Sequence, residues 1–219
     1  MTIVRCWEAL DCEVWRVDLD QVLPKDVDGN LAAEELAKAV RFRFERDRQR
    51  YIRSHLILRS LLSNITGRRS GDIAIRHNSL GRPFLPDDDS IHFSLSRSMD
   101  VALIGISRYR EIGVDVECVQ AMPGVDAVVQ EVCCSSEQEQ WLGVAESCKA
   151  TAFAICWTRK EAALKAVGSG LSIEPSLAHV GFSLAPSVTR LPTSNGTASI
   201  HIASFYVDRR TIGSIATVS

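Results

Sequence analysis

EIGVDVE, residues 111–117, alternates apolar residues with a glycine and two acids. Side chains alternate across a β-strand, so we expect an apolar face on one side and Gly113, Asp115 and Glu117 together on the other. Two carboxylates on neighbouring positions of one face repel each other, and the glycine leaves room beside them. The stretch therefore predicts a strand with a partner or ligand opposite its acids.

Composition sets the class of protein. The chain has 219 residues, of which 46% are hydrophobic and 24% charged, as in a soluble globular protein of one large or two small domains. A net charge of −2 excludes a generally basic nucleic-acid coat, so anion binding must come from local clusters. Seven cysteines without a Cys-x-x-Cys pair indicate reduced thiols. With no signal peptide or membrane span in the sequence, we expect a cytoplasmic location.

Hydrophobic periodicity predicts the order of elements. Helical spacing favours helices at about 31–65, 123–132 and 151–167, with a further helix started by a Ser136–Glu139 capping box. Alternating or apolar runs predict strands at 72–77, 91–95, 101–107, 111–117, 178–184, 198–206 and 212–218. We expect 111–117 to return as the hairpin partner of 101–107. Each half thus reads as a helix followed by about three strands, which predicts two related lobes with a cleft between them.

The two acids of the opening stretch have two interpretations. An exposed strand face is often polar, which would make Asp115 and Glu117 simply solvated. Alternatively, they are part of a magnesium site, because Mg²⁺ takes a few carboxylate oxygens and completes its shell with water and phosphates.

The stretch WTRKEAALK, residues 157–165, holds the next candidate group. Glu161 and Lys165 are four residues apart on a predicted helix and share a face. They form either a surface ion pair or a carboxylate that serves as metal ligand or base beside a cation that steadies phosphate charge. The loop Gly168-Ser169-Gly170 that follows would let backbone approach a ligand.

An arginine stripe, RFRFERDRQRYIR, occupies residues 41–53. On a continuous helix, one face would carry Arg43, Arg46, Arg50 and Arg53. Such a run is either a solvated face or an anion-binding face, and the interleaved aromatic residues leave RNA contact open.

Taken in order, these pieces resemble the 4′-phosphopantetheinyl transferases, in particular their larger, monomeric, surfactin-synthetase-type branch. The similarity runs from about residue 35 to 175. The matching motifs are GRP (81–83), FSLSRS (93–98), GVDVE (113–117), WTRKEAALK (157–165) and GSGL (168–171).

The resemblance implies an α+β fold of two pseudo-twofold-related lobes, each a helix packed on a small sheet, with coenzyme A in the cleft. We expect the N-terminal lobe to span 1–110 and the C-terminal lobe 111–219. The implied reaction is Mg²⁺-dependent transfer of the 4′-phosphopantetheine arm of coenzyme A to a serine of an apo carrier protein, releasing 3′,5′-ADP.

The resemblance also assigns roles to residues. It implies that Asp115, Glu117 and Glu161 are metal ligands, that Glu161 and Lys165 are catalytic, and that Glu137 lies near the site. The implied coenzyme A contacts are Lys38, Arg43, Arg50, Arg82, Pro83, Ser96, Arg97 and Lys160. Arg97 stands where the family has a histidine that contacts the 3′-phosphate, and a fixed cation suits the same contact.

Partners follow from the same resemblance. We expect a monomer that acts on acyl or peptidyl carrier proteins of fatty-acid, polyketide or non-ribosomal peptide synthesis, with neither nucleic acid nor membrane as partner. Residues 118–135, largely uncharged and apolar, are one candidate docking segment. The alternatives are a Mg²⁺-dependent pyrophosphate hydrolase and a non-catalytic coenzyme A- or RNA-binding protein.

Overall fold

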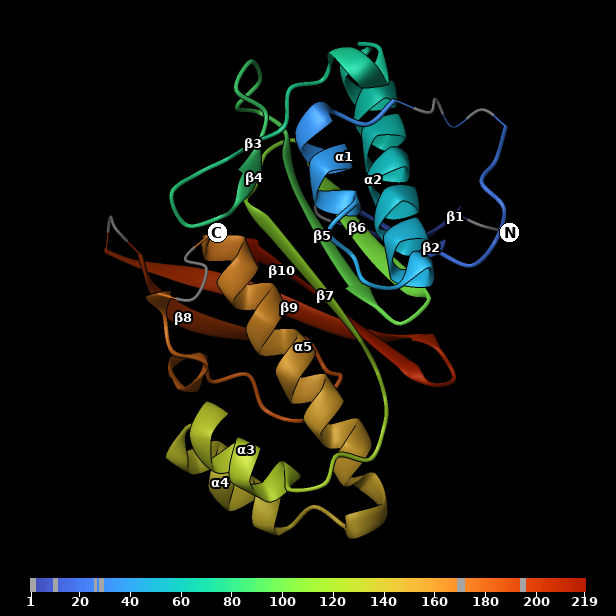
Figure 1. The fold of residues 1–219 in the computed structure, drawn as a ribbon. Helices are drawn as coiled ribbons and strands as arrows, with labels where there is room; N and C mark the ends of the chain where they lie inside the picture. Colours follow the sequence, from blue (N-terminus) through green and yellow to red (C-terminus); the bar gives the residue numbers. More distant parts are fainter. Residues whose placement is uncertain (1–2, 10–11, 26, 28–29, 169–171, 194–195) are drawn as a thin grey trace.

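The fold consists of helices packed on small antiparallel sheets (Figure 1). The computed structural model describes the chain except residues 1–2, 10–11, 26, 28–29, 169–171 and 194–195. Its strands are β1 (Ile3–Ala9), β2 (Cys12–Asp18), β3 (Arg76–His77), β4 (Pro83–Phe84), β5 (His92–Ser98), β6 (Val101–Ser107), β7 (Ile112–Cys118), β8 (Ser187–Thr193), β9 (Gly196–Asp208) and β10 (Thr211–Val218). Its α-helices are α1 (Ala33–Ala39), α2 (Glu45–Thr66), α3 (Val125–Val132), α4 (Ser135–Leu142) and α5 (Lys149–Val167). The α+β class predicted from the sequence is confirmed.

The first four-stranded sheet has the order β1-β2-β6-β5 and is covered by α2. Acids in the first turn of α2 favour its start, and Gly67, with φ of 70°, ends it in the left-handed conformation that glycine adopts easily. Ile57 and Leu62 of α2 are fully buried against Phe93 and Ile104 of the sheet. This apolar contact fixes the helix over β5 and β6.

The second four-stranded sheet has the order β7-β10-β9-β8, and α5 crosses it. The face of α5 toward the sheet carries the small residues Ala162, Ala163 and Ala166, which are completely buried. Small side chains let a helix approach its sheet closely. Groups on β7 and on the last turns of α5 therefore come within reach of one another.

The two sheets pack against each other through their remaining faces. In β6, Val101 and Leu103 belong to this shared core, whereas Ala102 and Ile104 face α2. Burial on both faces explains why VALIGIS has no polar alternation. The apolar face of β7 enters the same shared core, so the opposite face, with its acids, is directed toward α5.

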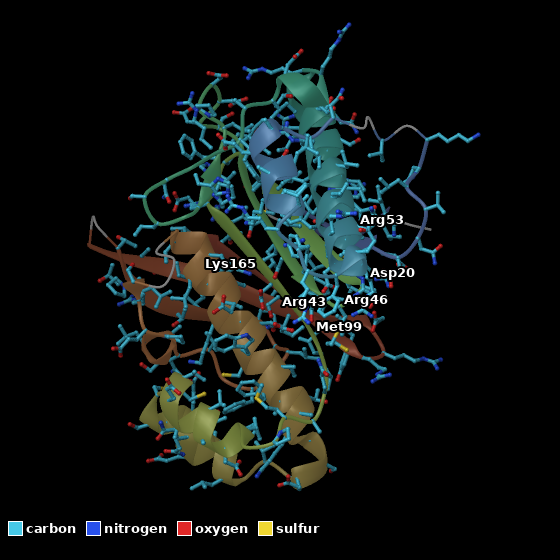
Figure 2. All side chains as sticks on the ribbon, viewed as in Figure 1. Asp20, Arg43, Arg46, Arg53, Met99 and Lys165 are labelled. Carbon is cyan, nitrogen blue, oxygen red and sulfur yellow. The ribbon has the colours of Figure 1, made fainter. Side chains whose placement is uncertain are left out.

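The single helix predicted over 31–65 is wrong, because the chain leaves the helical conformation between α1 and α2. Phe44, which precedes α2, is extended, and the ring of Phe42 turns back to lie 5.2 Å from that of Tyr51. Arg43 consequently precedes α2 and does not share its helical face, whereas Arg46 and Arg53 lie on the helix (Figure 2).

The predicted hairpin of 101–107 with 111–117 is also wrong. Both edges of β6 are already paired, with β2 and with β5, so β7 joins the other sheet as the partner of β10. The strand expected at 178–184 is absent from these described residues, and β8 follows it at 187–193. α4 begins one residue before the expected cap, with Glu137 accepting the Cys134 amide hydrogen instead of a Ser136–Glu139 box.

Within the described part of the chain, every helix falls short of the length and apolarity needed to cross a bilayer. The pseudo-twofold relation of two lobes, and the division at residue 110, stay predictions.

Candidate functional site

Gly113 allows β7 to lie directly against α5. A Cβ at this position would lie 2.0 Å from the carbonyl oxygen of Ala162 and 2.5 Å from the amide nitrogen of Ala166. Both atoms belong to helix backbone and cannot turn aside. The glycine is therefore required for this close approach, which sets Asp115 and Glu117 beside the helix turn that carries Glu161 and Lys165.

A buried acid and a lysine from these two elements form an ion pair. The Lys165 ammonium lies 2.6 Å from Asp115 Oδ1 and also donates to the Ser96 hydroxyl at 3.1 Å and the Val114 carbonyl at 3.3 Å. The side chain of Asp115 is 5% exposed, whereas that of Lys165 is 32% exposed. The lysine thus connects the buried acid with the surface of a cavity.

Three serines of β5 hold β7 in place. Ser94 accepts a hydrogen bond from the Val114 amide, Ser96 donates to Asp115 at 2.7 Å, and Ser98 donates to Glu117 at 2.7 Å. β5 and β7 belong to different sheets, so these hydroxyls connect the two sheets where backbone pairing is absent. Both Ser96 and Ser98 lie within β5, which extends past the strand predicted at 91–95, and the period-two serines of FSLSRS were the signal for a shared function.

Electrostatics at the acids favour a cation. Burial raises the pKa of Asp115, although the bonds from Lys165 and Ser96 oppose the shift. Burial also raises the pKa of Glu117 and of Glu161, and the charge of Asp115 adds to the shift in both. Asp115 Oδ2 is buried without a hydrogen-bond partner among the described residues. An orphaned carboxylate oxygen with further acids in electrostatic range fits a hard divalent cation.

Two other groups of potential metal ligands lie closer together than Asp115, Glu117 and Glu161 do. Cys133, Glu137 and Cys156 have ligand atoms within 4.8 Å of one another, as do Cys134, Glu137 and His179. Glu137, however, accepts from Lys160, from the Cys134 amide and from the amides of Val180 and Gly181. Its oxygens are fully used, so this cluster is a structural junction of α4, α5 and the segment at 178–181.

Lys160 belongs to that junction. Its side chain is completely buried, and its ammonium donates to Glu137 at 2.7 Å and to the carbonyls of Pro175 and Ala178. All three donor hydrogens are therefore in use inside the protein. This placement does not support the expected contact of Lys160 with a pyrophosphate. It also makes Glu137 the buried partner of Lys160, which is a structural role.

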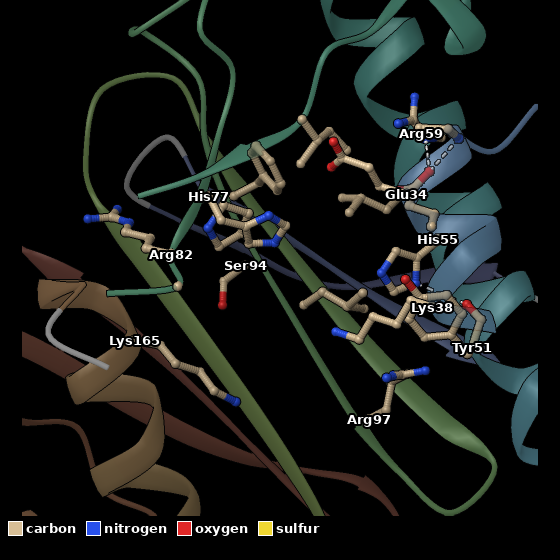
Figure 3. Close-up of a pocket in the computed structure, with 18 of the residues that line it drawn as sticks. Glu34, Lys38, Tyr51, His55, Arg59, His77, Arg82, Ser94, Arg97 and Lys165 are labelled. Atoms are coloured by element: carbon tan, nitrogen blue, oxygen red, sulfur yellow. Dashed lines mark hydrogen bonds and ion pairs between the residues drawn. The ribbon is translucent and has the colours of Figure 1, made fainter. Parts of the chain in front are cut away.

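A cavity of about 660 Å³ lies between α1, α2, β5 and the end of α5 (Figure 3). Charged and aromatic side chains point into it from opposite sides, and Lys165 is among the lining residues. The lining includes Lys38, Tyr51, His55, Arg82, Pro83, Ser94, Arg97, Lys165 and Gly168. Its size and its cations suit a large anionic ligand.

Two of the predicted cations have defined positions in this cavity. The Arg97 guanidinium lies over the ring of Tyr51, 4.9 Å from its centroid. Arg82 forms an ion pair with Glu111 at 2.8 Å, and its side chain would lie 2.7 Å from any Cβ added to Gly168. The turn GRP and the end of α5 are therefore in direct contact, which the sequence could not show because they are more than eighty residues apart.

The other predicted ligand contacts are distributed more widely. Lys38 and Pro83 line the cavity, whereas Ser96 and Arg50 line a neighbouring hollow, where Asp20 pairs with Arg50. Arg43 is absent from both sets of lining residues. The rest of the loop Gly168-Ser169-Gly170 lies outside the described residues.

His55 lines the cavity although the sequence gave no signal for it. Its ring lies 4.0 Å from that of Tyr51, and Nδ1 approaches the Tyr51 carbonyl at 3.0 Å. Burial, assisted by the charges of Arg97 and Lys38, lowers the pKa of His55 to about 4. The imidazole is therefore neutral at pH 7 and provides ring surface without charge.

Comparisons with known proteins identify similar chains. Residues 26–107 match the family model described as 4′-phosphopantetheinyl transferase, N-terminal, and residues 111–212 match that of the 4′-phosphopantetheinyl transferase superfamily. The 4′-phosphopantetheinyl transferase HetI of Nostoc sp. is 29% identical over 213 residues, 89% of each chain. The transferase gsp of Aneurinibacillus migulanus is 27% identical over 71% of this chain and 64% of its own length. Sfp of Bacillus subtilis is 24% identical over 65% of this chain and 62% of its own.

The two family models cover consecutive segments that meet between β6 and β7, and the second includes the acids and lysine of the site. The chain belongs to the 4′-phosphopantetheinyl transferase superfamily.

Proposed function

We propose that this protein transfers the 4′-phosphopantetheine arm of coenzyme A to a serine of an apo acyl or peptidyl carrier protein, releasing 3′,5′-ADP. The observation that carries the proposal is the position of Lys165, which lines the cationic cavity and at the same time contacts Asp115. A diphosphate held in the cavity would therefore meet the acid cluster of β7 and α5.

We propose Asp115, Glu117 and Glu161 as the ligands of Mg²⁺. The orphaned Oδ2 of Asp115 and the raised pKa values of all three carboxyls support this assignment. When bound, Mg²⁺ neutralises the diphosphate and relieves the repulsion between the acids.

The chain's own groups account for the remaining steps. Lys165 stabilises the negative charge that develops on the departing 3′,5′-ADP, because its ammonium is fixed at the cavity edge by Asp115. Glu161 accepts the proton of the attacking serine, a role that its raised pKa favours. Lys38, Arg82 and Arg97 line the cavity and bind the phosphates of coenzyme A, with Arg97 replacing the histidine of the family.

We further propose that the protein is a cytoplasmic monomer whose N-terminal lobe spans 1–110 and whose C-terminal lobe spans 111–219. The sulfurs of Cys133 and Cys156 lie 3.7 Å apart without a disulfide between them, which favours a reducing compartment. The cavity draws its cations from the first segment and its lysine from the second, which supports a ligand bound between them.

The test is incubation of the protein with coenzyme A, Mg²⁺ and a panel of apo carrier proteins, followed by mass spectrometry of the carriers. Gain of one phosphopantetheine arm is expected, together with its loss in Asp115→Ala and Glu161→Ala. Glu139→Ala, on the exposed side of α4, is the matched control that should keep full activity.

Release of 3′,5′-ADP without any carrier would instead indicate a pyrophosphate hydrolase. Binding of coenzyme A without release, unchanged in Glu161→Ala, would indicate a non-catalytic binding protein. Either result overturns the proposal.

A further inference from the structure

β5 and β7 are edge strands of the two four-stranded sheets, and serine hydroxyls connect these edges. Ser96 bonds to Asp115, and Ser98 bonds to Glu117. The two serines are two residues apart on β5, as are the two acids on β7, and side chains with this spacing share one face of a strand. Each acid therefore has a serine of its own from the other sheet.

The serines use one oxygen of each acid and leave the other oxygen to a further partner. Ser98 Oγ donates to Glu117 Oε2 at 2.7 Å, while Glu117 Oε1 accepts no hydrogen bond from the described residues. Ser96 likewise donates to Asp115 Oδ1, while Oδ2 has no partner in that part of the chain. A hydroxyl has a single hydrogen, so its direction decides which carboxylate oxygen stays available to a cation.

Glu117 depends on its serine more than Asp115 does. The Lys165 ammonium also holds Asp115, at 2.6 Å, so this acid keeps a partner when the Ser96 hydroxyl is removed. Ser98, by contrast, is the one side chain in the described structure that hydrogen-bonds to Glu117. A glutamate has several side-chain torsions, and without Ser98 its carboxylate would sample several positions.

Ser98 is itself held firmly and lies behind the acids. It is the last residue of β5 and pairs with Val101 across the turn to β6. Its hydroxyl also accepts the Cys118 amide hydrogen at 3.1 Å, which orients the oxygen from a second side. Ser98 is absent from the lining residues of the large cavity and of the neighbouring hollow. Any effect of this hydroxyl on the reaction is therefore exerted through Glu117.

We propose that Ser98 is a positioning residue, which holds Glu117 through Oε2 and leaves Oε1 available to Mg²⁺. This inference rests on the proposed function, in which Glu117 is a metal ligand. Partners that orient metal ligands are part of a metal site, and their removal typically lowers metal affinity about 10–100-fold. Ser98 thus sets the affinity of the site for the metal without touching either substrate.

The experiment compares Ser98→Val with Ser98→Thr. Threonine and valine have nearly the same shape and both suit a strand, so the two variants differ chiefly in the hydroxyl. Each protein is titrated with Mn²⁺ in the absence of coenzyme A and carrier, and free aquated Mn²⁺ is measured by its EPR signal. Ser98→Val should raise the Kd for Mn²⁺ about tenfold or more, whereas Ser98→Thr should stay within about threefold of the wild type. Ser98→Ala, which removes the hydroxyl without adding a methyl group, should match Ser98→Val.

Ser90→Ala is the matched control. The Ser90 hydroxyl donates to Asp88 at 2.6 Å, so this variant also removes a hydrogen bond from a serine to a carboxylate, but at an exposed turn outside the acid cluster. The Kd for Mn²⁺ should not change. Urea denaturation of every variant measures stability separately from metal binding.

Kinetics separate positioning from catalysis. Ser98→Val should raise the Mg²⁺ concentration needed for half-maximal carrier modification by about the same factor as the Kd, and at saturating Mg²⁺ its kcat should stay within about threefold of the wild type.

Two outcomes overturn the inference alone. In the first, Ser98→Val loses stability but keeps the Kd of the wild type, which would show that Ser98 only joins the sheets. In the second, Ser98→Thr and Ser98→Val lose affinity equally, which would show that the hydroxyl is not responsible. A wild type that binds no Mn²⁺ refutes the metal assignment, and a wild type that binds Mn²⁺ but modifies no carrier refutes the proposed transfer reaction instead.

Discussion

Replacing Gly113 with alanine tests whether the contact of β7 with α5 sets the geometry of the site. The new Cβ would lie 2.0 Å from the Ala162 carbonyl oxygen, whereas real Cβ contacts essentially never fall below 3.0 Å. Because the obstacle is helix backbone, α5 must move away from β7 by about 1 Å. Overpacking of this kind lowers the free energy of unfolding by about 1–3 kcal/mol.

The same displacement affects catalysis. Lys165 is 2.6 Å from Asp115, so a shift of about 1 Å breaks that contact and separates the acids of β7 from Glu161. A misplacement of about 1 Å reduces kcat on the order of 10²-fold. Urea denaturation measures the change in stability, and initial rates of carrier modification measure kcat.

Gly213→Ala is the matched control. It lies on β10, beside β7, and its Cβ would meet the side-chain ends of Leu103 and Val207 at 2.7 and 2.8 Å, which can turn aside. We expect some loss of stability and a kcat near that of the wild type. A Gly113→Ala protein with unchanged stability and unchanged kcat would refute the reasoning.

Three further predictions concern the charged groups. Burial raises the pKa of Asp115, so ionisation of this carboxyl destabilises the folded protein as the pH rises past the ordinary carboxyl pKa. Mg²⁺ should therefore raise Tm more at pH 8 than at pH 5. An increase in Tm that does not depend on pH, or that is retained in Asp115→Asn, would contradict this prediction. Lys165→Ala should lower kcat on the order of 10²-fold and should also lower Tm, because buried Asp115 loses its cation; an unaltered rate would remove the lysine from the mechanism. Lys160→Met should instead lower the free energy of unfolding by about 3–5 kcal/mol, because Glu137 is left as a buried charge. A Lys160→Met protein of normal stability but high KM for coenzyme A would show that Lys160 binds the ligand after all.

The sequence predicted the elements whose pattern is local. The alternation in EIGVDVE gave β7 and the orientation of its acids, and the apolar spacing with a terminal glycine gave α5 and its end at Gly168. It did not reveal the break between α1 and α2. That break depends on the packing of Phe42 against Tyr51, which is a tertiary contact. The N-terminal strands β1 and β2 were not predicted, because frequent charges obscured their alternation.

For the site, too, the sequence predicted the local pattern, and only the structure showed which residues come together. Residue type and spacing selected Asp115, Glu117, Glu161 and Lys165, and the fold draws them into one electrostatic cluster. Spacing could not separate a buried structural cation from a ligand-binding one. Lys160 and Lys165 are five residues apart on one helix, yet only one reaches the cavity.

The most direct measurement is a crystal structure of the protein with coenzyme A and Mn²⁺, which replaces Mg²⁺ and is located by its anomalous scattering. The proposed function predicts one peak coordinated by Asp115, Glu117 and Glu161, with the diphosphate of coenzyme A bound to the same ion and to Lys165. A peak elsewhere, or coenzyme A bound away from these groups, would contradict it.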